Sequence, residues 1–126
     1  MNKKGKSLLI VGILFVVMSM LLTIHFEYEQ VYSKIKSDDT MKQILNKTID
    51  NKENIKTIEI NGLEYIGYLV IPSLELNLPV TKEYTPYSLK ISPSIYYGSI
   101  ESNNLVICGH AYRNIFGNLY KLKPGD

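Results

Sequence analysis

An uncharged apolar segment near the N-terminus limits what this chain can bury in a soluble core. Residues 7–24 carry no charged side chain and are rich in leucine, isoleucine, valine, methionine and phenylalanine. At 1.5 Å per residue, a helix over this segment spans roughly 27 Å, close to the hydrocarbon thickness of a bilayer. Lys3, Lys4 and Lys6 precede it, and positive charge favours the cytoplasmic side. The sequence therefore predicts a cytoplasmic basic tail (residues 1–6) and a transmembrane signal anchor (residues 7–26).

A cleaved signal peptide is the alternative interpretation of the same segment. Cleavage requires small residues in an A-x-A-like arrangement after the apolar core. Residues 21–26 read Leu-Leu-Thr-Ile-His-Phe and offer no such site. We therefore expect an uncleaved, single-pass anchor in the cell membrane, with the N-terminus in the cytoplasm and the rest of the chain extracellular.

The charge balance argues against nucleic acid as a partner. The net charge is +2, but three of the fourteen basic residues belong to the basic tail, which leaves eleven against twelve acidic residues outside. Nucleic-acid binding needs a basic stripe, which the near-neutral exterior lacks. The single cysteine excludes an internal disulfide. No metal-ligand cluster and no glycine-rich phosphate loop is present, so we expect no metal and no cofactor.

Residues 27–54 differ in composition from both of their neighbours. They are polar, mix acidic residues with lysine, and contain neither proline nor glycine. This composition predicts a solvated juxtamembrane helix that acts as a stalk or linker. An unstructured tether is the alternative. The apolar residues of the segment fall only loosely at helical spacing: Val31, Ile35, Ile44, Leu45 and Ile49.

From residue 55 onward the apolar period changes to two, which is typical of β-strands. Asn61-Gly62 has the composition of a tight hairpin turn, and residues 63–71 form the next strand candidate. Further strands are expected over residues 76–80, 95–97 and 105–108, with a loop over residues 84–93. Pro79 indicates an edge position or a strand end. The pattern predicts an all-β sandwich or barrel, with one or two helical turns over residues 114–121.

Four short segments together resemble the sortase family in order and spacing. They are Gly67–Pro72 (GYLVIP), Leu76–Val80 (LNLPV), Asn104–His110 (NLVICGH), and a final segment in which Phe116, Leu119 and Leu122 precede Gly125-Asp126. The resemblance covers residues 65–126, about half of the chain. Each segment alone is a weak signal, but their succession behind a membrane anchor is specific.

The resemblance implies a fold and a reaction. Sortases are membrane-anchored cysteine transpeptidases of mainly Gram-positive bacteria, built on an eight-stranded β-barrel. They cut an LPxTG-like sorting signal between Thr and Gly, and they join the Thr to an amine of the cell wall or of a pilin. A cysteine, a histidine and an arginine carry the chemistry. The Gly-His step implies that His110 is the histidine, with an acid/base role that suits imidazole near neutral pH.

The same resemblance also implies what these residues lack. The family's cysteine lies on a later strand, typically in a T-L-x-T-C run followed by an arginine, and this sequence contains neither. We therefore expect residues 55–126 to be the N-terminal half of a sortase domain, an incomplete barrel with unpaired edge strands, and the chain alone to be truncated and inactive. The alternative is a non-catalytic, membrane-tethered β module that binds peptides or a sortase partner.

Three side chains near the end of the chain invite catalytic interpretations. Cys108 and His110 project to the same face of a strand, but their Cβ atoms are expected roughly 6.6 Å apart, so Cys108 is interpreted as a buried small apolar residue. For His110, a structural role at the strand end is the alternative to acid/base catalysis. Arg113 follows the histidine, whereas the family's arginine follows the cysteine, and it is interpreted as a solvated loop residue.

Overall fold

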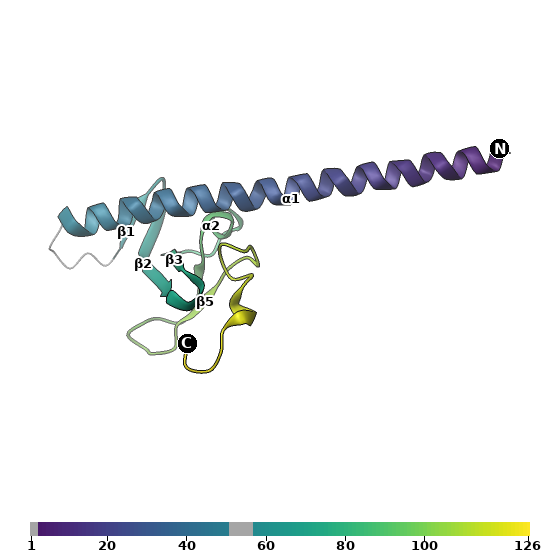
Figure 1. Ribbon diagram of the computed structural model, residues 1–126. Coiled ribbons are helices and arrows are strands. Elements are labelled where there is room, and N and C mark those ends of the chain that lie inside the picture. Colours follow the sequence, from purple (N-terminus) through teal and green to yellow (C-terminus); the bar gives the residue numbers. More distant parts are fainter. Residues whose placement is uncertain (1–2, 51–56) are drawn as a thin grey trace.

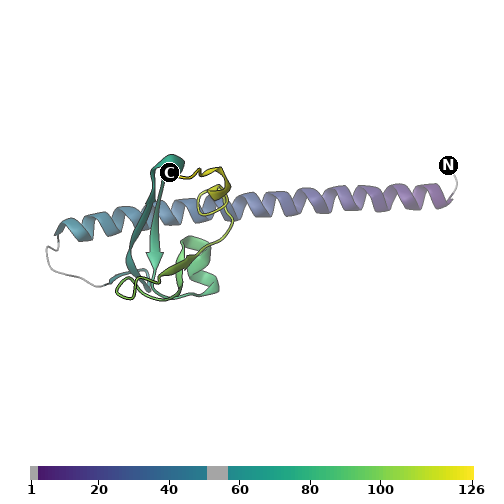
Figure 2. The same ribbon diagram turned by 90° about the horizontal axis from the view of Figure 1, so that it is seen from below.

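The computed structural model describes residues 3–50 and 57–126. One long helix, α1 (Lys3–Asp50), lies against a small β domain. The domain covers only the C-terminal half of α1, and the N-terminal half projects beyond it (Figure 1). The view from below shows the same arrangement (Figure 2).

The apolar segment forms the projecting part of α1. Its side chains are exposed from Leu8 to Ile24, and nothing in the described chain covers its most apolar window. By length and composition this helix could span a membrane. Water is a poor solvent for so many exposed apolar side chains, and a lipid environment is a good one.

The stalk is helical as far as Asp50, but it is not solvated on all sides. One face is buried against the β domain, at the three- and four-residue spacing that places side chains on one helix face. Of the apolar residues that fall loosely at helical spacing, Val31, Ile35 and Leu45 are exposed, and Ile49 lies outside the residues whose side chains the structure describes. The buried face is mostly polar and small: Gln30, Ser33, Ser37, Thr40 and Ile44.

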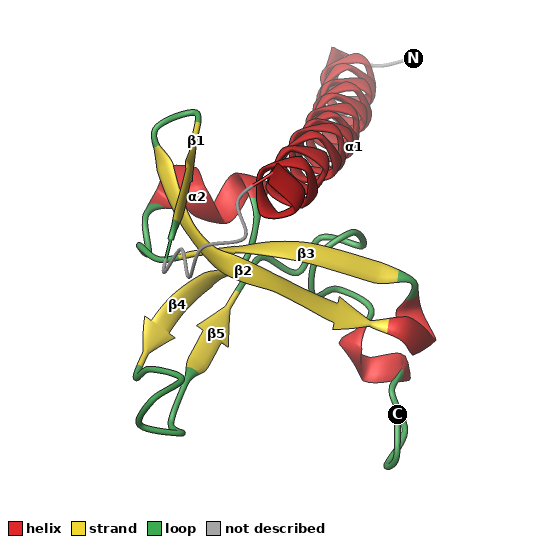
Figure 3. Cartoon of the chain, turned by 90° about the vertical axis from the view of Figure 1, so that its left-hand side faces the viewer, coloured by secondary structure: helices red, strands yellow, loops and turns green. Residues whose placement is uncertain are grey.

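The β domain is a single five-stranded sheet in sequential order (Figure 3). Neighbouring strands are antiparallel, except that β3 and β4 run parallel and meet only at Thr81 and Ser94. In the described part of the chain the sheet is open, so closure into a barrel remains a prediction. Residues 55 and 56, expected to begin the first strand, lie outside the described residues. The strands are β1 (Ile58–Ile60), β2 (Leu63–Ile71), β3 (Leu76–Thr81), β4 (Ser94–Tyr97) and β5 (Val106–Cys108).

The hairpin between β1 and β2 forms as its turn residues predict. Asn61 and Gly62 both have positive φ, at 52° and 77°, and the flanking residues Ile60 and Leu63 pair directly. Two successive positive φ angles define the turn type that matches the twist of the strands. Between β2 and β3, the expected break forms a short 3₁₀ turn, η1 (Pro72–Leu74).

The prediction of a loop over residues 84–93 is wrong, because a helix, α2 (Pro86–Ile91), lies within it. Thr85 caps the helix: its hydroxyl accepts from the Ser88 N–H at 2.9 Å, and the Ser88 hydroxyl accepts from the Thr85 N–H at 3.0 Å. Pro86 is the first residue of the helix, and its ring fixes φ near the helical value. Pro86 and Ser88 therefore begin a helix within the segment that was expected to be a loop. One or two helical turns were expected over residues 114–121. The helix observed there is a shorter 3₁₀ turn, η2 (Leu119–Lys121).

Replacing Ile44 tests whether α1 and the sheet share a core. Ile44 is 1% exposed and packs with Ile60 and Tyr65. We expect Ile44→Ala to destabilise the domain by about 2–5 kcal/mol, because it leaves a cavity at this contact. Urea unfolding of the full chain in detergent micelles, followed by the near-ultraviolet circular dichroism of its ten tyrosines, measures the change.

Leu45→Ala is the matched control for that experiment. Leu45 is the next residue on α1 but is 41% exposed. Its replacement should change the free energy of unfolding by no more than about 0.5 kcal/mol. Equal effects of the two substitutions would contradict the packing of α1 on the sheet.

Candidate functional site

A close backbone approach sets the position of His110 at the end of β5. A Cβ atom on Gly109 would lie 2.9 Å from Ile115 Cγ2 and 3.0 Å from the Phe116 ring. Glycine therefore lets the chain leave β5 directly against these two side chains. The chain then turns back, and the Phe116 N–H donates to the His110 carbonyl at 3.2 Å. The Gly-His step of the sequence thus has a steric reason in this fold.

The His110 ring is half-buried and lies against Tyr112. The two rings stack with centroids 4.9 Å apart and an interplanar angle of 27°. The Tyr112 ring also contacts the Phe26 ring of α1 in an edge-to-face arrangement, with the ring centroids 6.2 Å apart. Among the described residues, no side chain forms a hydrogen bond with the His110 imidazole. The described side chains therefore leave both ring nitrogens available to hydrogen-bond with another group.

Cys108 is not activated as a nucleophile in this structure. Its thiol donates to the Ser94 carbonyl on β4, with 3.7 Å between the heavy atoms, and burial raises the pKa of the thiol. In the described chain, no hydrogen bond joins it to His110. A reactive cysteine needs a neighbouring cation or base that lowers its pKa. The surroundings of Cys108 support its interpretation as a packing residue.

Glu29 fixes the loop after His110 to α1. The Tyr112 hydroxyl donates to Glu29 Oε2 at 3.2 Å, and the Lys90 ammonium of α2 lies 3.4 Å from Glu29 Oε1. The hydrogen bond from Lys90 and, to a smaller extent, the one from Tyr112 lower the pKa of the Glu29 carboxyl. Burial, together with Glu29, raises the pKa of the Tyr112 phenol. Both shifts favour a neutral phenol donating to a carboxylate.

Arg113 joins the same loop to α1 through two contacts. Its guanidinium Nη2 lies 2.8 Å from Glu27 Oε1, and its backbone N–H donates to Gln30 Oε1 at 3.2 Å. The side chain is 72% exposed, as expected of a loop residue. The backbone contact is what the sequence did not indicate.

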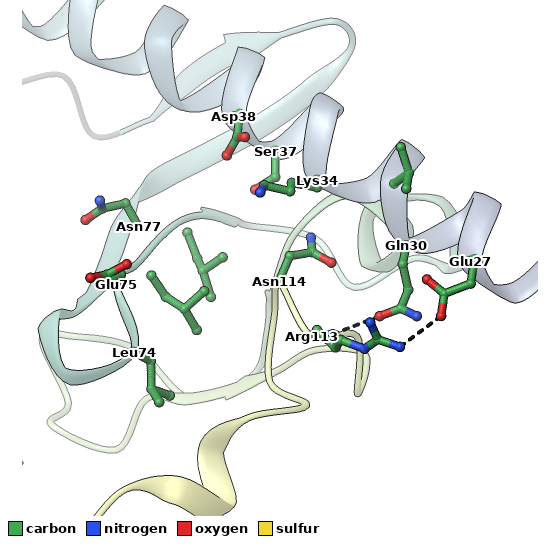
Figure 4. A pocket seen from close by; sticks show the side chains of 13 residues that line it. Glu27, Gln30, Lys34, Ser37, Asp38, Leu74, Glu75, Asn77, Arg113 and Asn114 are labelled. Atoms are coloured by element: carbon green, nitrogen blue, oxygen red, sulfur yellow. Dashed lines mark hydrogen bonds and ion pairs between the residues drawn. The ribbon is translucent and has the colours of Figure 1, made fainter.

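A groove of about 440 Å³ lies between α1, the start of β3 and the loop at Arg113 and Asn114 (Figure 4). Gln30 and Ser37 on α1 are 6% and 3% exposed, and the Gln30 Nε2 and Ser37 Oγ atoms have no hydrogen-bond partner within residues 3–50 and 57–126. Buried polar atoms without partners are rare in proteins and call for an explanation. Sequence reasoning missed this groove. The available signal was the spacing of Gln30, Ser33 and Ser37 along one face of the stalk.

Comparisons with protein-family models, with curated proteins and with solved structures found no match to this chain. The site therefore rests on its own geometry. That geometry gives a half-buried imidazole at a strand end and, separately, a groove with unpaired polar atoms. Among the described residues, no three His, Cys, Asp or Glu side chains gather closely enough to hold a metal ion.

The hydrogen bonds that Glu29 accepts from Lys90 and Tyr112 should make stability depend on pH. The folded state lowers the pKa of Glu29, so its stabilising effect is complete above the pKa of the unfolded chain, about 4.3, and is lost as the pH falls through the folded value. We expect the urea midpoint of the wild type to fall more steeply below about pH 4 than that of Glu29→Gln. Equal slopes for the two proteins would contradict this role of Glu29.

The surroundings of Cys108 predict slow alkylation. At pH 8 we expect iodoacetamide to modify the native thiol more slowly than an exposed cysteine, because burial raises the pKa of the thiol and lowers its thiolate fraction. Val106→Cys in a Cys108→Ala background is the matched control, since Val106 lies on the same strand and is exposed. Faster modification of Cys108 than of the control would reopen its interpretation as a nucleophile.

Proposed function

We propose that this chain is a membrane-anchored, sortase-type module in which His110 is the acid/base of a transpeptidation. The observation that carries the proposal is an imidazole at the end of β5, half-buried and without a hydrogen-bonded partner among the described residues. The succession of sequence segments that resemble sortases supports the same assignment. The substrates would be an LPxTG-like sorting signal and an amine of the cell wall or of a pilin.

These 126 residues would not catalyse that reaction by themselves. Their single cysteine is Cys108, and its thiol is held protonated against the Ser94 carbonyl. Their only arginine is Arg113, which is paired with Glu27. Loss of the nucleophile from a comparable triad lowers turnover by about 10⁶. The proposal therefore places the cysteine and the arginine of the reaction on residues outside this sequence.

In this proposal α1 is the anchor, with residues 7–26 in the bilayer and the N-terminus in the cytoplasm. The three lysines before the apolar segment support that orientation. The β domain and His110 would then lie on the extracellular side, where sorting signals and wall amines occur.

One observation favours a second candidate function, a non-catalytic module that binds peptides or a sortase partner. Two of the three buried side-chain polar atoms that lack a partner among the described residues, Gln30 Nε2 and Ser37 Oγ, belong to residues that line the groove beside α1. A bound chain could satisfy both without any contribution from His110.

The coding sequence that follows codon 126 gives the decisive test. We expect a T-L-x-T-C run followed by an arginine codon. The protein that includes those residues should cleave an LPxTG peptide and transfer it to a glycine amine, whereas the 126-residue chain should not. In that protein, His110→Ala should lower kcat/KM by about 10²–10⁴, because the acid/base is lost.

His25→Ala is the matched control, since His25 is the other histidine of the chain and lies on α1. It should leave kcat/KM unchanged. Absence of the cysteine run in any reading frame would reject the sortase-type proposal and leave the second candidate. A longer protein that is active but unaffected by His110→Ala would reject the role of His110.

A further inference from the structure

The edge of β3 presents unpaired backbone groups to the groove. The Thr81 N–H donates to the Pro93 carbonyl at 2.9 Å, so Thr81 directs its backbone groups away from β2. In an antiparallel pair, alternate residues direct these groups to the same side. Asn77 and Pro79 therefore also face away from β2, and proline has no N–H to present. Because β4 meets β3 only at Thr81, the N–H and C=O of Asn77 face outward and pair with no strand in the described part of the chain.

Gln30 and Ser37 of α1 line the same groove (Figure 4), and among the described residues their Nε2 and Oγ atoms have no hydrogen-bond partner. Gln30 Oε1 already accepts from the Arg113 N–H, so the amide's orientation is fixed and Nε2 is the donor left unpaired. The Ser37 hydroxyl can both donate and accept. The groove thus offers donors and an acceptor on two facing walls, in the pattern that a peptide backbone satisfies.

The remaining lining gives the side-chain preference. Leu74, Leu76 and Leu78 supply an apolar floor. The charged lining consists of three carboxylates and two cations, and the pairing of Glu27 with Arg113 leaves two carboxylates against one lysine. These two carboxylates belong to Asp38 and Glu75. This balance favours a ligand with aliphatic side chains and one basic side chain.

We propose that this groove binds an extended peptide segment of a partner protein, which adds to the edge of β3 as a further strand. Strand addition uses free backbone groups for affinity and side-chain pockets for specificity. The peptide would pair with the backbone of Asn77, accept from Gln30 Nε2, bond to Ser37 Oγ, and direct a lysine or arginine toward Asp38 and Glu75. The proposal deepens the second candidate function. It does not involve His110, which does not line the groove.

A selection experiment tests the proposal and identifies the peptide sequence that the groove prefers. A displayed library of random ten-residue peptides is selected on the full chain in lipid nanodiscs and, in parallel, on a Gln30→Glu, Ser37→Ala double variant. Gln30→Glu keeps the acceptor for the Arg113 N–H and removes the donor. We expect peptides with alternating aliphatic residues and one basic residue to be enriched on the wild type only.

Selected peptides are then synthesised with single backbone N-methyl groups. Methylation at alternate positions should weaken binding at least ten-fold, and methylation at the positions between them should not, because only alternate N–H groups face the strand. A uniform effect along the peptide, or no peptide that distinguishes wild type from the double variant, would overturn the proposal.

Ser37→Ala and Ser33→Ala form a matched pair on the same helix face. The Ser37 hydroxyl has no partner, whereas Ser33 Oγ accepts from Asn114 Nδ2 at 3.1 Å. Ser37→Ala should therefore weaken peptide binding while its urea midpoint stays equal to that of the wild type or rises, and Ser33→Ala should lower the midpoint. Equal destabilisation by both would show that Ser37 is structural and overturn its role in binding.

A second copy of this chain is the competing occupant of the strand edge. Sedimentation of the nanodisc-free chain in detergent distinguishes the two. Dimers that form with rising concentration and are broken by Ser37→Ala would overturn the proposal in favour of self-pairing. A monomer that binds selected peptides supports it.

Discussion

The attachment of the loop after β5 to the stalk of α1 is the contact on which the rest of this structure depends. Glu29 receives hydrogen bonds from Tyr112 and Lys90, and Gln30 receives one from the Arg113 backbone. Each bond alone contributes little because water competes for these groups, but together they join α1, α2 and the loop. They add to the apolar contact of Ile44 with Ile60 and Tyr65, and they hold the loop wall of the groove against α1.

Buried hydroxyl groups hydrogen-bond to one another where β3 and β4 have little backbone pairing. β3 and β4 meet at one residue pair, and there Thr81 Oγ1 hydrogen-bonds to Ser94 Oγ, which also bonds to Ser88 Oγ of α2 at 3.0 Å. All three residues are almost completely buried, and their polar atoms satisfy one another. A network of this kind fixes a parallel junction that one bridge could not define alone.

Sequence reasoning located the strands because their signals are local. The Asn61-Gly62 turn and the aromatic and branched residues over 63–71 determine conformation through neighbouring residues only. The predictions that failed have two other causes. The capping box of α2 uses serine where glutamate or glutamine is usual, so its composition resembled a loop. The buried face of the stalk is polar, and its burial depends on partners about 80 residues away in the sequence, such as Asn114 for Ser33. His110 could be singled out from its sequence motif, but the groove depends on tertiary packing that no local pattern encodes.

The continuity of α1 has a geometric consequence for any function of this domain. The loop after His110 contacts α1 at Phe26, Glu29 and Gln30, which lie within about 6 Å of one another along the helix axis. If residues 7–26 cross a bilayer as proposed, these contacts hold His110 and the groove beside the membrane surface. A flexible tether would let the domain sample a range of heights, whereas a helix docked over this length does not. A peptide that reaches either site must therefore approach along the bilayer, so partners held at the same membrane meet the domain more readily than those in bulk solution.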